Sequence, residues 1–210
     1  MSEVFVVSAM RSAIGGFGGT LKDVPPHELG TTVIKAALEK AGVSGEDVGH
    51  VVVGHVVNTE PRDQYLSRLA SVNAGVSKET PAMNVNRLCG SGLQAIISAA
   101  QSIKLGDADV AIGAGVEVMS RGPYITPSLR WGARMGDNKI VDMMTGALTD
   151  PFEVVHMGVT AENVAKEFDI SREEQDELAV ESHRRAINAI EKGYFKEQIV
   201  PVTIKTRKGE

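Results

Sequence analysis

The amino-acid sequence predicts an α/β fold with a mainly parallel sheet covered by helices. Short apolar runs such as VVVGHVV at 51–57 and ADVAIG at 108–113 are typical of strands that are buried on both faces. Between these runs lie stretches with helical spacing, bounded by proline or glycine. Such alternation is the pattern of βαβ units, whose crossover helices cover a parallel sheet.

The expected elements follow one another in order up to residue 118. Pro26 opens an amphipathic stretch whose apolar residues share one face, and Gly42 ends it. The expected strands are Val4–Ser8, His50–Val57, Ala82–Asn86 and Asp109–Gly113, and the other expected helices are Gln64–Asn73 and Ser91–Leu105.

The pattern changes at Met119. Residues 119–150 show little periodicity, and an irregular segment of this length indicates a functional excursion. Regular structure is expected again as a helix over 159–167. The capping box Ser171–Glu174 should then open a further helix that Gly193 ends, and Ile199–Lys205 should form a last strand.

Composition excludes several classes of protein. The 210 residues are 42% hydrophobic and carry a net charge of -5, so a basic surface for nucleic acid is not expected. The KTRK run at 205–208 is interpreted as a solvated turn. No apolar run is long enough to span a membrane and the N-terminus lacks a signal-peptide pattern, so we expect a cytoplasmic protein. One cysteine excludes an intrachain disulfide and a CxxC metal site, and no metal is expected.

The densest chemical signal is NRLCGSGLQAI at 86–96. A strand is expected to end there, a tight turn to carry Cys89, and a helix to begin. Unpaired amides at a helix start favour a thiolate, and Gly90 and Gly92 leave room for an acyl group beside the sulfur. The same amides could hydrogen-bond an oxyanion. On local chemistry alone, a catalytic nucleophile and a buried structural cysteine remain equally open.

A cysteine nucleophile needs a base, and no histidine has a sequence argument for pairing with this one. His27 and His183 are expected on helix surfaces, and His50 and His55 in structural roles on or beside a strand. His156 precedes a helix at the end of the irregular segment, where it could contact a ligand. The catalytic apparatus therefore looks incomplete in these residues.

Two glycine-rich segments, 15–19 and 113–115, invite a nucleotide-binding interpretation. The first does not open a helix, and the second lacks the third glycine of a dinucleotide fingerprint. We predict that both are tight turns.

Several motifs, in the same order, resemble the thiolase family, and the resemblance extends along essentially the whole chain. They are NRLCGSGLQAI at 86–96, RSAIGGFGG at 11–19, GAGVEVMS at 113–120 and HMGVTAENVA at 156–165. The segments RWGARMG at 130–136 and TEPR at 59–62 look most like bacterial β-ketothiolases that accept chains longer than acetoacetyl. The resemblance implies a thiolase-like layered fold, with an N-terminal α/β domain over 1–118 and part of an inserted lid, or loop, domain over 119–210.

The resemblance also implies an acyl-CoA C-acyltransferase, either an acetyl-CoA C-acetyltransferase or a β-ketothiolase, with CoA and acetyl-CoA as substrates and no prosthetic group. Cys89 would accept an acyl group, and the thioester would undergo Claisen condensation with acetyl-CoA, or form by thiolysis of a 3-ketoacyl-CoA in the reverse direction. The Cys89 amide would help to form an oxyanion hole. Leu148, His156 and Met157 match positions that line the pantetheine tunnel, and the loop around Tyr124–Asp142 matches the one that joins dimers into tetramers. A homodimer or homotetramer is therefore expected.

The sequence departs from the family in its extent. Family members are about twice these 210 residues long, and their second half carries an asparagine, a Gly-His-Pro histidine and a second cysteine, none of which this chain has. We therefore interpret it as a partial chain, without its C-terminal thiolase domain and inactive alone. Two other interpretations remain: a condensing enzyme of the ketoacyl-synthase type, and a non-catalytic thiolase-like protein that binds lipid.

Overall fold

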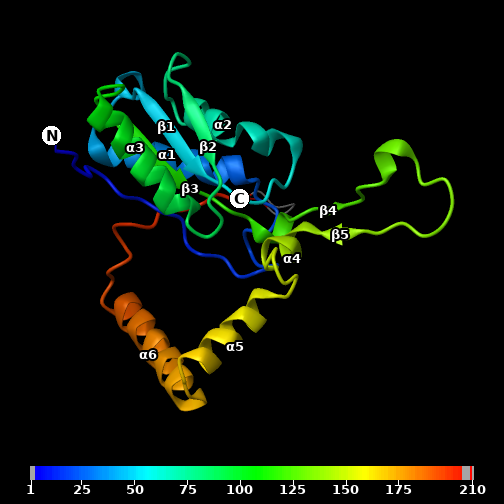
Figure 1. Ribbon diagram of the computed structural model, residues 1–210. Coiled ribbons are helices and arrows are strands. Elements are labelled where there is room, and N and C mark those ends of the chain that lie inside the picture. The colour runs from blue at the N-terminus through cyan, green and yellow to red at the C-terminus, as the bar shows by residue number, and fades with distance from the viewer. Residues whose placement is uncertain (1–2, 205–208, 210) are drawn as a thin grey trace.

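The core of the protein is a three-stranded parallel sheet in the order β2-β1-β3. The computed structural model describes residues 3–204 and residue 209. In the sheet, β1 spans His50–Gly54, β2 spans Ala82–Val85 and β3 spans Ala111–Gly115. The central strand, β1, is fully buried at Val51, Val52 and Val53 because helices cover both faces of the sheet (Figure 1). The expected α/β class is confirmed.

The alternating side chains of β1 divide the core between the two faces of the sheet. Val51 and Val53 pack with α1 (Pro26–Ala41) and α2 (Leu66–Asn73), whereas Val52 packs with α3 (Ser91–Leu105). Short 3-10 helices at Gly45–Asp47 and Pro61–Tyr65 precede β1 and α2. The boundaries of α1 follow the sequence signals, since Pro26 is its first residue and Gly42 ends it in the left-handed conformation at φ 65°.

Gly113 and Gly115 lie inside β3, so the prediction of a tight turn at 113–115 is wrong. A Cβ atom on Gly113 would lie 2.6 Å from the Cα of Ile96, and one on Gly115 would lie 3.0 Å from the Cα of Gly92. These glycines therefore allow the backbone of α3 to approach the strand. The other segment, 15–19, does contain a turn, in which Gly18 has φ 69° and Gly19 donates to the carbonyl of Gly16.

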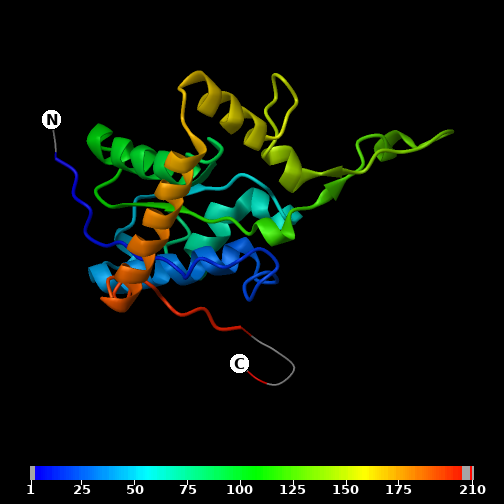
Figure 2. The same ribbon diagram turned by 90° about the horizontal axis from the view of Figure 1, so that it is seen from below.

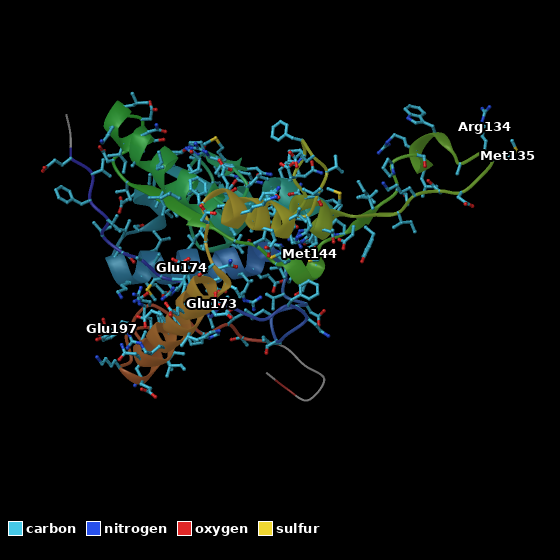
Figure 3. All side chains as sticks on the ribbon, turned by 60° about the horizontal axis from the view of Figure 1, so that its bottom comes forward. Arg134, Met135, Met144, Glu173, Glu174 and Glu197 are labelled. Atoms are coloured by element: carbon cyan, nitrogen blue, oxygen red, sulfur yellow. The ribbon has the colours of Figure 1, made fainter. Side chains whose placement is uncertain are left out.

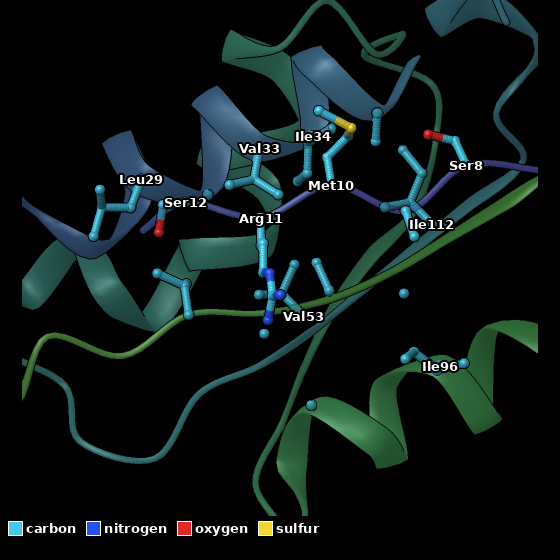
Figure 4. Close-up of a pocket in the computed structure, with 18 of the residues that line it drawn as sticks. Ser8, Met10, Arg11, Ser12, Leu29, Val33, Ile34, Val53, Ile96 and Ile112 are labelled. Carbon is cyan, nitrogen blue, oxygen red and sulfur yellow. The ribbon is translucent and has the colours of Figure 1, made fainter. Parts of the chain in front are cut away.

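The expected strand at Val4–Ser8 is not formed. This segment runs beside the sheet as extended chain, with Phe5, Val6 and Val7 more than two-thirds exposed. A cavity of about 910 Å³ separates it from β3, α1 and α3. Figure 4 shows the cavity with Ser8–Ser12 on one side and Ile96, Ile112 and Val53 around it. Ladder hydrogen bonds require strands about 4.8 Å apart, and across this cavity the segment lies too far from β3 to form them.

The expected strand at Ile199–Lys205 is also absent over its described part, 199–204. It forms one isolated parallel bridge, in which Arg11 and Ile199 pair: the Arg11 amide donates to Gln198 and the Val200 amide donates to Arg11, both at 2.8 Å. The guanidinium of Arg11 lies 4.6 Å from the ring centre of Phe195. Lys205 and the KTRK run fall outside the described residues.

The region after Met119 contains more regular structure than its sequence indicates. After a 3-10 turn at Met119–Arg121, the strands β4 (Tyr124–Ile125) and β5 (Val141–Asp142) pair antiparallel and form the base of a long arm. The arm includes a 3-10 turn at Leu129–Trp131 and projects away from the sheet in both views (Figures 1 and 2). Arg134 and Met135 lie at its end, far from the α6 residues Glu173 and Glu174 (Figure 3).

Three helices follow the arm: α4 (Met143–Ala147), α5 (Met157–Glu167) and α6 (Arg172–Glu191). The predicted capping box opens α6, with the Glu174 amide donating to Ser171 Oγ at 3.2 Å and the Ser171 amide donating to Glu174 at 2.8 Å. No helix in the described part of the chain is long and apolar enough to cross a bilayer.

Candidate active site

Cys89 lies in the turn that connects β2 to α3. The turn spans residues 86–90, and Gly90 is the N-cap of the helix, with no side chain to cap the first amides. The thiol of Cys89 is free and exposed. A cysteine packed beneath a helix, one of the two interpretations of its local sequence, is therefore wrong.

Two short polar side chains hold this turn. Asn86 Oδ1 accepts the Leu88 amide at 3.0 Å, and Ser91 Oγ accepts the Arg87 amide at 2.8 Å while donating to the Leu88 carbonyl at 2.6 Å. Leu88 has φ 48°, a conformation that is uncommon outside glycine. No role for Asn86 or Ser91 was expected from the sequence. The sequence feature that could have indicated this role is a short polar side chain beside the turn, because asparagine and serine readily form hydrogen bonds with nearby backbone groups.

The start of α3 is pressed against the end of β1. A Cβ atom on Gly54 would lie 2.5 Å from the carbonyl carbon and oxygen of Ser91 and 2.7 Å from the nitrogen of Gly92. Such distances do not occur between real atoms, so glycine at this position is a steric requirement. The sheet therefore determines where the helix begins, and with it where the turn of Cys89 lies.

Leu148, His156 and Met157, the predicted CoA contacts, lie together in the structure. The Met157 amide donates to the Leu148 carbonyl at 2.9 Å, and Thr149 and His156 form an antiparallel bridge. His156 is the N-cap of α5, and its Nδ1 accepts the Gly158 amide at 3.0 Å. Within the described residues, no hydrogen bond or ion pair connects this group to the turn of Cys89.

A polar cluster that the sequence did not indicate lies where β1 and β3 end. His55 is buried, and its Nδ1 lies 2.9 Å from the Val116 carbonyl and 3.3 Å from Glu117. The Glu117 carboxylate accepts the amides of Val56 and Val57 at 2.8 and 3.1 Å. The structural role expected for His55 agrees with these contacts.

His27 is buried, with 3% of its surface exposed, so the predicted helix-surface position is wrong. The first turn of α1 faces the segment 60–63, and ligand atoms of His27, Glu60 and Asp63 lie within 4.8 Å of one another. Such a set has the chemistry of a metal site. However, Arg121 pairs with Glu60 at 2.8 Å, and Asp63 accepts the amides of Thr59 and Glu60 as part of a reciprocal cap. Hydrogen bonds within the chain occupy Glu60 and the Oδ2 atom of Asp63, whereas Asp63 Oδ1 and His27 Nδ1 are buried without a hydrogen-bond partner among the described residues.

The sequence profile described as "Thiolase, N-terminal domain" matches residues 4–210. The chain belongs to the thiolase family. Among the relatives of this thiolase chain, "Beta-ketothiolase BktB" of Cupriavidus necator is 68% identical over 208 residues, 99% of this chain and 53% of that protein. An acetyl-CoA acetyltransferase of the same organism is 49% identical, over 100% of this chain and 53% of that protein. The chain spans about half the length of the curated relatives it matches.

Solved thiolases share this fold. A crystal structure of human mitochondrial 3-ketoacyl-CoA thiolase matches with a TM-score of 0.93 and 41% identity, covering 98% of this chain and 52% of that one. A structure of the same enzyme in complex with CoA matches with a TM-score of 0.91 and 40% identity, covering 94% of this chain and 50% of that one. The layered thiolase-like fold is thus confirmed, and the thiolase interpretation is favoured over the ketoacyl-synthase one.

Proposed function

We propose that the whole protein is an acyl-CoA C-acyltransferase of the β-ketothiolase type, and that Cys89 is its acyl acceptor. One observation carries the proposal: the chain's one cysteine is exposed in a strand–turn–helix connection, within a sequence 68% identical to a β-ketothiolase. This setting presents a nucleophile without burying it. The identity and the matching structures support the reaction class.

In the first step, the Cys89 sulfur attacks the thioester carbonyl of an acyl-CoA. A new carbon–sulfur bond forms and the bond to CoA breaks, while the cysteine proton passes to a base, which then returns it to the departing sulfur so that CoA leaves as the free thiol. In the second step, acetyl-CoA loses an α-proton to a base, and the resulting enolate attacks the cysteine thioester. A carbon–carbon bond forms, the cysteine is released, and the product is a 3-ketoacyl-CoA. Thiolysis is the same sequence in reverse, with ping-pong kinetics expected in both directions.

The proton transfers need groups beyond those that this chain supplies near Cys89. No hydrogen bond or ion pair in the described part of the chain links a histidine to the cysteine, and such acid–base steps contribute about 10²–10⁴-fold in rate. By resemblance to the family, a histidine, an asparagine and a second cysteine in the other half of the whole protein supply them. The exposed apolar residues Leu93, Ile97 and Leu105 on α3 are consistent with a further layer packed against this helix.

The region after Met119 is proposed to be the lid domain, with the α/β domain ending at residue 118. Leu148, His156 and Met157 are proposed to contact the pantetheine arm of CoA, which the local clustering of these residues supports. We place the protein in the cytoplasm, because a thiol nucleophile must remain reduced.

The arm between β4 and β5 is proposed to join copies of the protein into a homodimer or homotetramer. Trp131 is 85% exposed and Met135 is 98% exposed on it, and aromatic residues and methionine are enriched where protein surfaces meet. Light scattering of the whole protein and of a Trp131→Asp variant tests this. A shift of the variant to a smaller species supports the assignment, and an unchanged mass contradicts it.

The central test uses the whole protein with Cys89→Ala and Cys89→Ser variants. Incubation with acetyl-CoA should place an acetyl group on the peptide that contains Cys89, detected by mass spectrometry after digestion, and both variants should lose the adduct and the thiolysis activity. An acylated carrier protein serves as the competing donor. Retention of full activity by Cys89→Ala would disprove the nucleophile, and labelling by the carrier protein alone would favour a ketoacyl synthase.

A further inference from the structure

The peptide bonds before Cys89 are held in an unfavourable conformation by side chains. We propose that Ser91, together with Asn86, is a positioning residue that fixes both the sulfur and the backbone amide of Cys89, an inference that rests on the proposed role of this cysteine. Neither residue is expected to react with substrate.

Leu88, the residue before Cys89, has an unusual backbone conformation. Its φ of 48° lies in the left-handed region, which residues with a branched side chain rarely adopt. The leucine side chain is 51% exposed, so packing of this side chain does not hold the conformation. Both backbone polar groups of Leu88 are bonded instead: the amide donates to Asn86 Oδ1 at 3.0 Å, and the carbonyl accepts from Ser91 Oγ at 2.6 Å and from the Ser91 amide at 2.9 Å.

Ser91 uses its hydroxyl in both available roles. The oxygen accepts the Arg87 amide at 2.8 Å and the hydrogen goes to the Leu88 carbonyl, so one side chain ties together two consecutive residues of the turn. Ser91 is itself rigidly placed, because it is 4% exposed and its backbone lies against Gly54 in the sheet. The sheet therefore fixes the position of Ser91, and the hydrogen bonds of Ser91 fix the conformation of the turn.

The Leu88 carbonyl belongs to the same peptide unit as the Cys89 amide. The described residues include no cis peptide bond, and in a trans peptide the carbonyl and the amide point in opposite directions. Fixing the carbonyl with the Ser91 hydroxyl therefore fixes the direction of the Cys89 N–H, the group expected to donate to the oxyanion. Acylation requires that the sulfur and the oxyanion donor are correctly placed. Both placements depend on the hydrogen bond from Ser91 Oγ to the Leu88 carbonyl.

The experiment compares Ser91→Ala with Ser102→Ala in the whole protein. Ser102 lies further along the same helix and donates to the Ser98 carbonyl at 3.2 Å, so the control removes a serine-to-carbonyl bond without touching the turn. We expect Ser91→Ala to lower kcat by about 10- to 100-fold, the effect of a misplaced reacting group, with KM for acyl-CoA little changed. The rate at which iodoacetamide alkylates Cys89 should fall as well, and Ser102→Ala should resemble the unaltered enzyme in all three measurements.

A rescue separates positioning from a general loss of structure. Asparagine adopts the left-handed region more readily than leucine, so Leu88→Asn should make the loss from Ser91→Ala smaller. Asn86 is exposed, which makes its variants a second test if Ser91→Ala does not fold: Asn86→Ala should lower kcat, and Asn86→Asp, which keeps the acceptor, should restore part of it. If Ser91→Ala and Asn86→Ala match Ser102→Ala in kcat and alkylation, the positioning role is wrong, whereas an active Cys89→Ala would refute the proposed function itself.

Discussion

At the scale of single residues, Gly54 makes the most specific prediction. Replacing it with alanine would put a methyl group 2.5 Å from backbone atoms of Ser91, so the start of α3 must move. Because overpacking of this kind costs about 1–3 kcal/mol, Gly54→Ala should lower the free energy of unfolding by that amount, measured by denaturant titration. The same shift should slow acylation of Cys89.

Gly146→Ala is the matched control for that substitution. Gly146 lies in α4, and a Cβ atom there would meet nothing within 4 Å. Alanine is favoured over glycine in helices by about 1 kcal/mol, so this variant should be as stable as the unaltered protein or slightly more stable. If Gly54→Ala and Gly146→Ala lower the free energy of unfolding equally, the contact between Gly54 and Ser91 is not tight.

The sequence correctly predicted that Cys89 lies in a turn at a helix start, because strand, turn and helix signals there are local, whereas its exposure was left open and came from the structure. It could not explain Gly113 and Gly115. A glycine in a turn and a glycine beneath a helix look alike in sequence, and only the position of α3 distinguishes them. The same limit applies to His27, whose burial depends on a segment more than thirty residues away.

At the scale of elements, helices agreed with the sequence better than strands did. The boundaries of α1 and α3 and the capping box of α6 depend on neighbouring residues, and all were predicted. A strand forms only where another strand, often distant in sequence, lies close enough to pair with it. The cavity separates Val4–Ser8 from β3, so the two do not pair. Likewise, β1 ends at Gly54 instead of Val57 because the amides of Val56 and Val57 bond the Glu117 carboxylate.

Helix α6 carries a prediction about pH. Glu181 accepts from Arg184 and Arg185, and hydrogen bonds from these two guanidinium groups lower the pKa of Glu181 from 4.5 to about 2. A lowered pKa means that the stabilisation is present above about pH 4.5 and is lost as the pH falls toward 2. Because the side chains are exposed, the effect should be small and weakened by salt.

A carbon-detected NMR titration of the whole protein checks this. The Glu181 carboxyl should titrate well below the ordinary glutamate value of 4.5. In Arg184→Gln the pKa of Glu181 should rise, since the first of its two partners is gone. If the pKa of Glu181 is instead found at the ordinary value of 4.5, the ion pair does not persist in solution.

At the scale of the whole molecule, a large apolar surface lies open. The cavity of about 910 Å³ between β3 and the N-terminal segment is lined mainly by apolar residues, and Phe5, Ile14 and Phe17 beside it are exposed. Outside the cavity, α3 also exposes Leu93 and Ile97. Patches of this size usually mark surfaces that another part of a protein covers. In the matched relatives, which are about twice as long, further chain is available to cover such surfaces.

This surface leads to a prediction for the 210-residue chain prepared by itself. Such a chain should bind the dye ANS strongly, because exposed apolar clusters bind it, whereas the whole protein should bind little. It should also show no turnover of acetoacetyl-CoA, since the acid–base groups of the reaction are expected in the other half. Alkylation of Cys89 with iodoacetamide should still proceed, because the turn that presents the thiol is complete within residues 86–91. Adding the separately prepared other half should reduce the ANS signal and restore thiolysis. Strong thiolysis by the 210 residues alone would show instead that they already contain a complete catalytic apparatus.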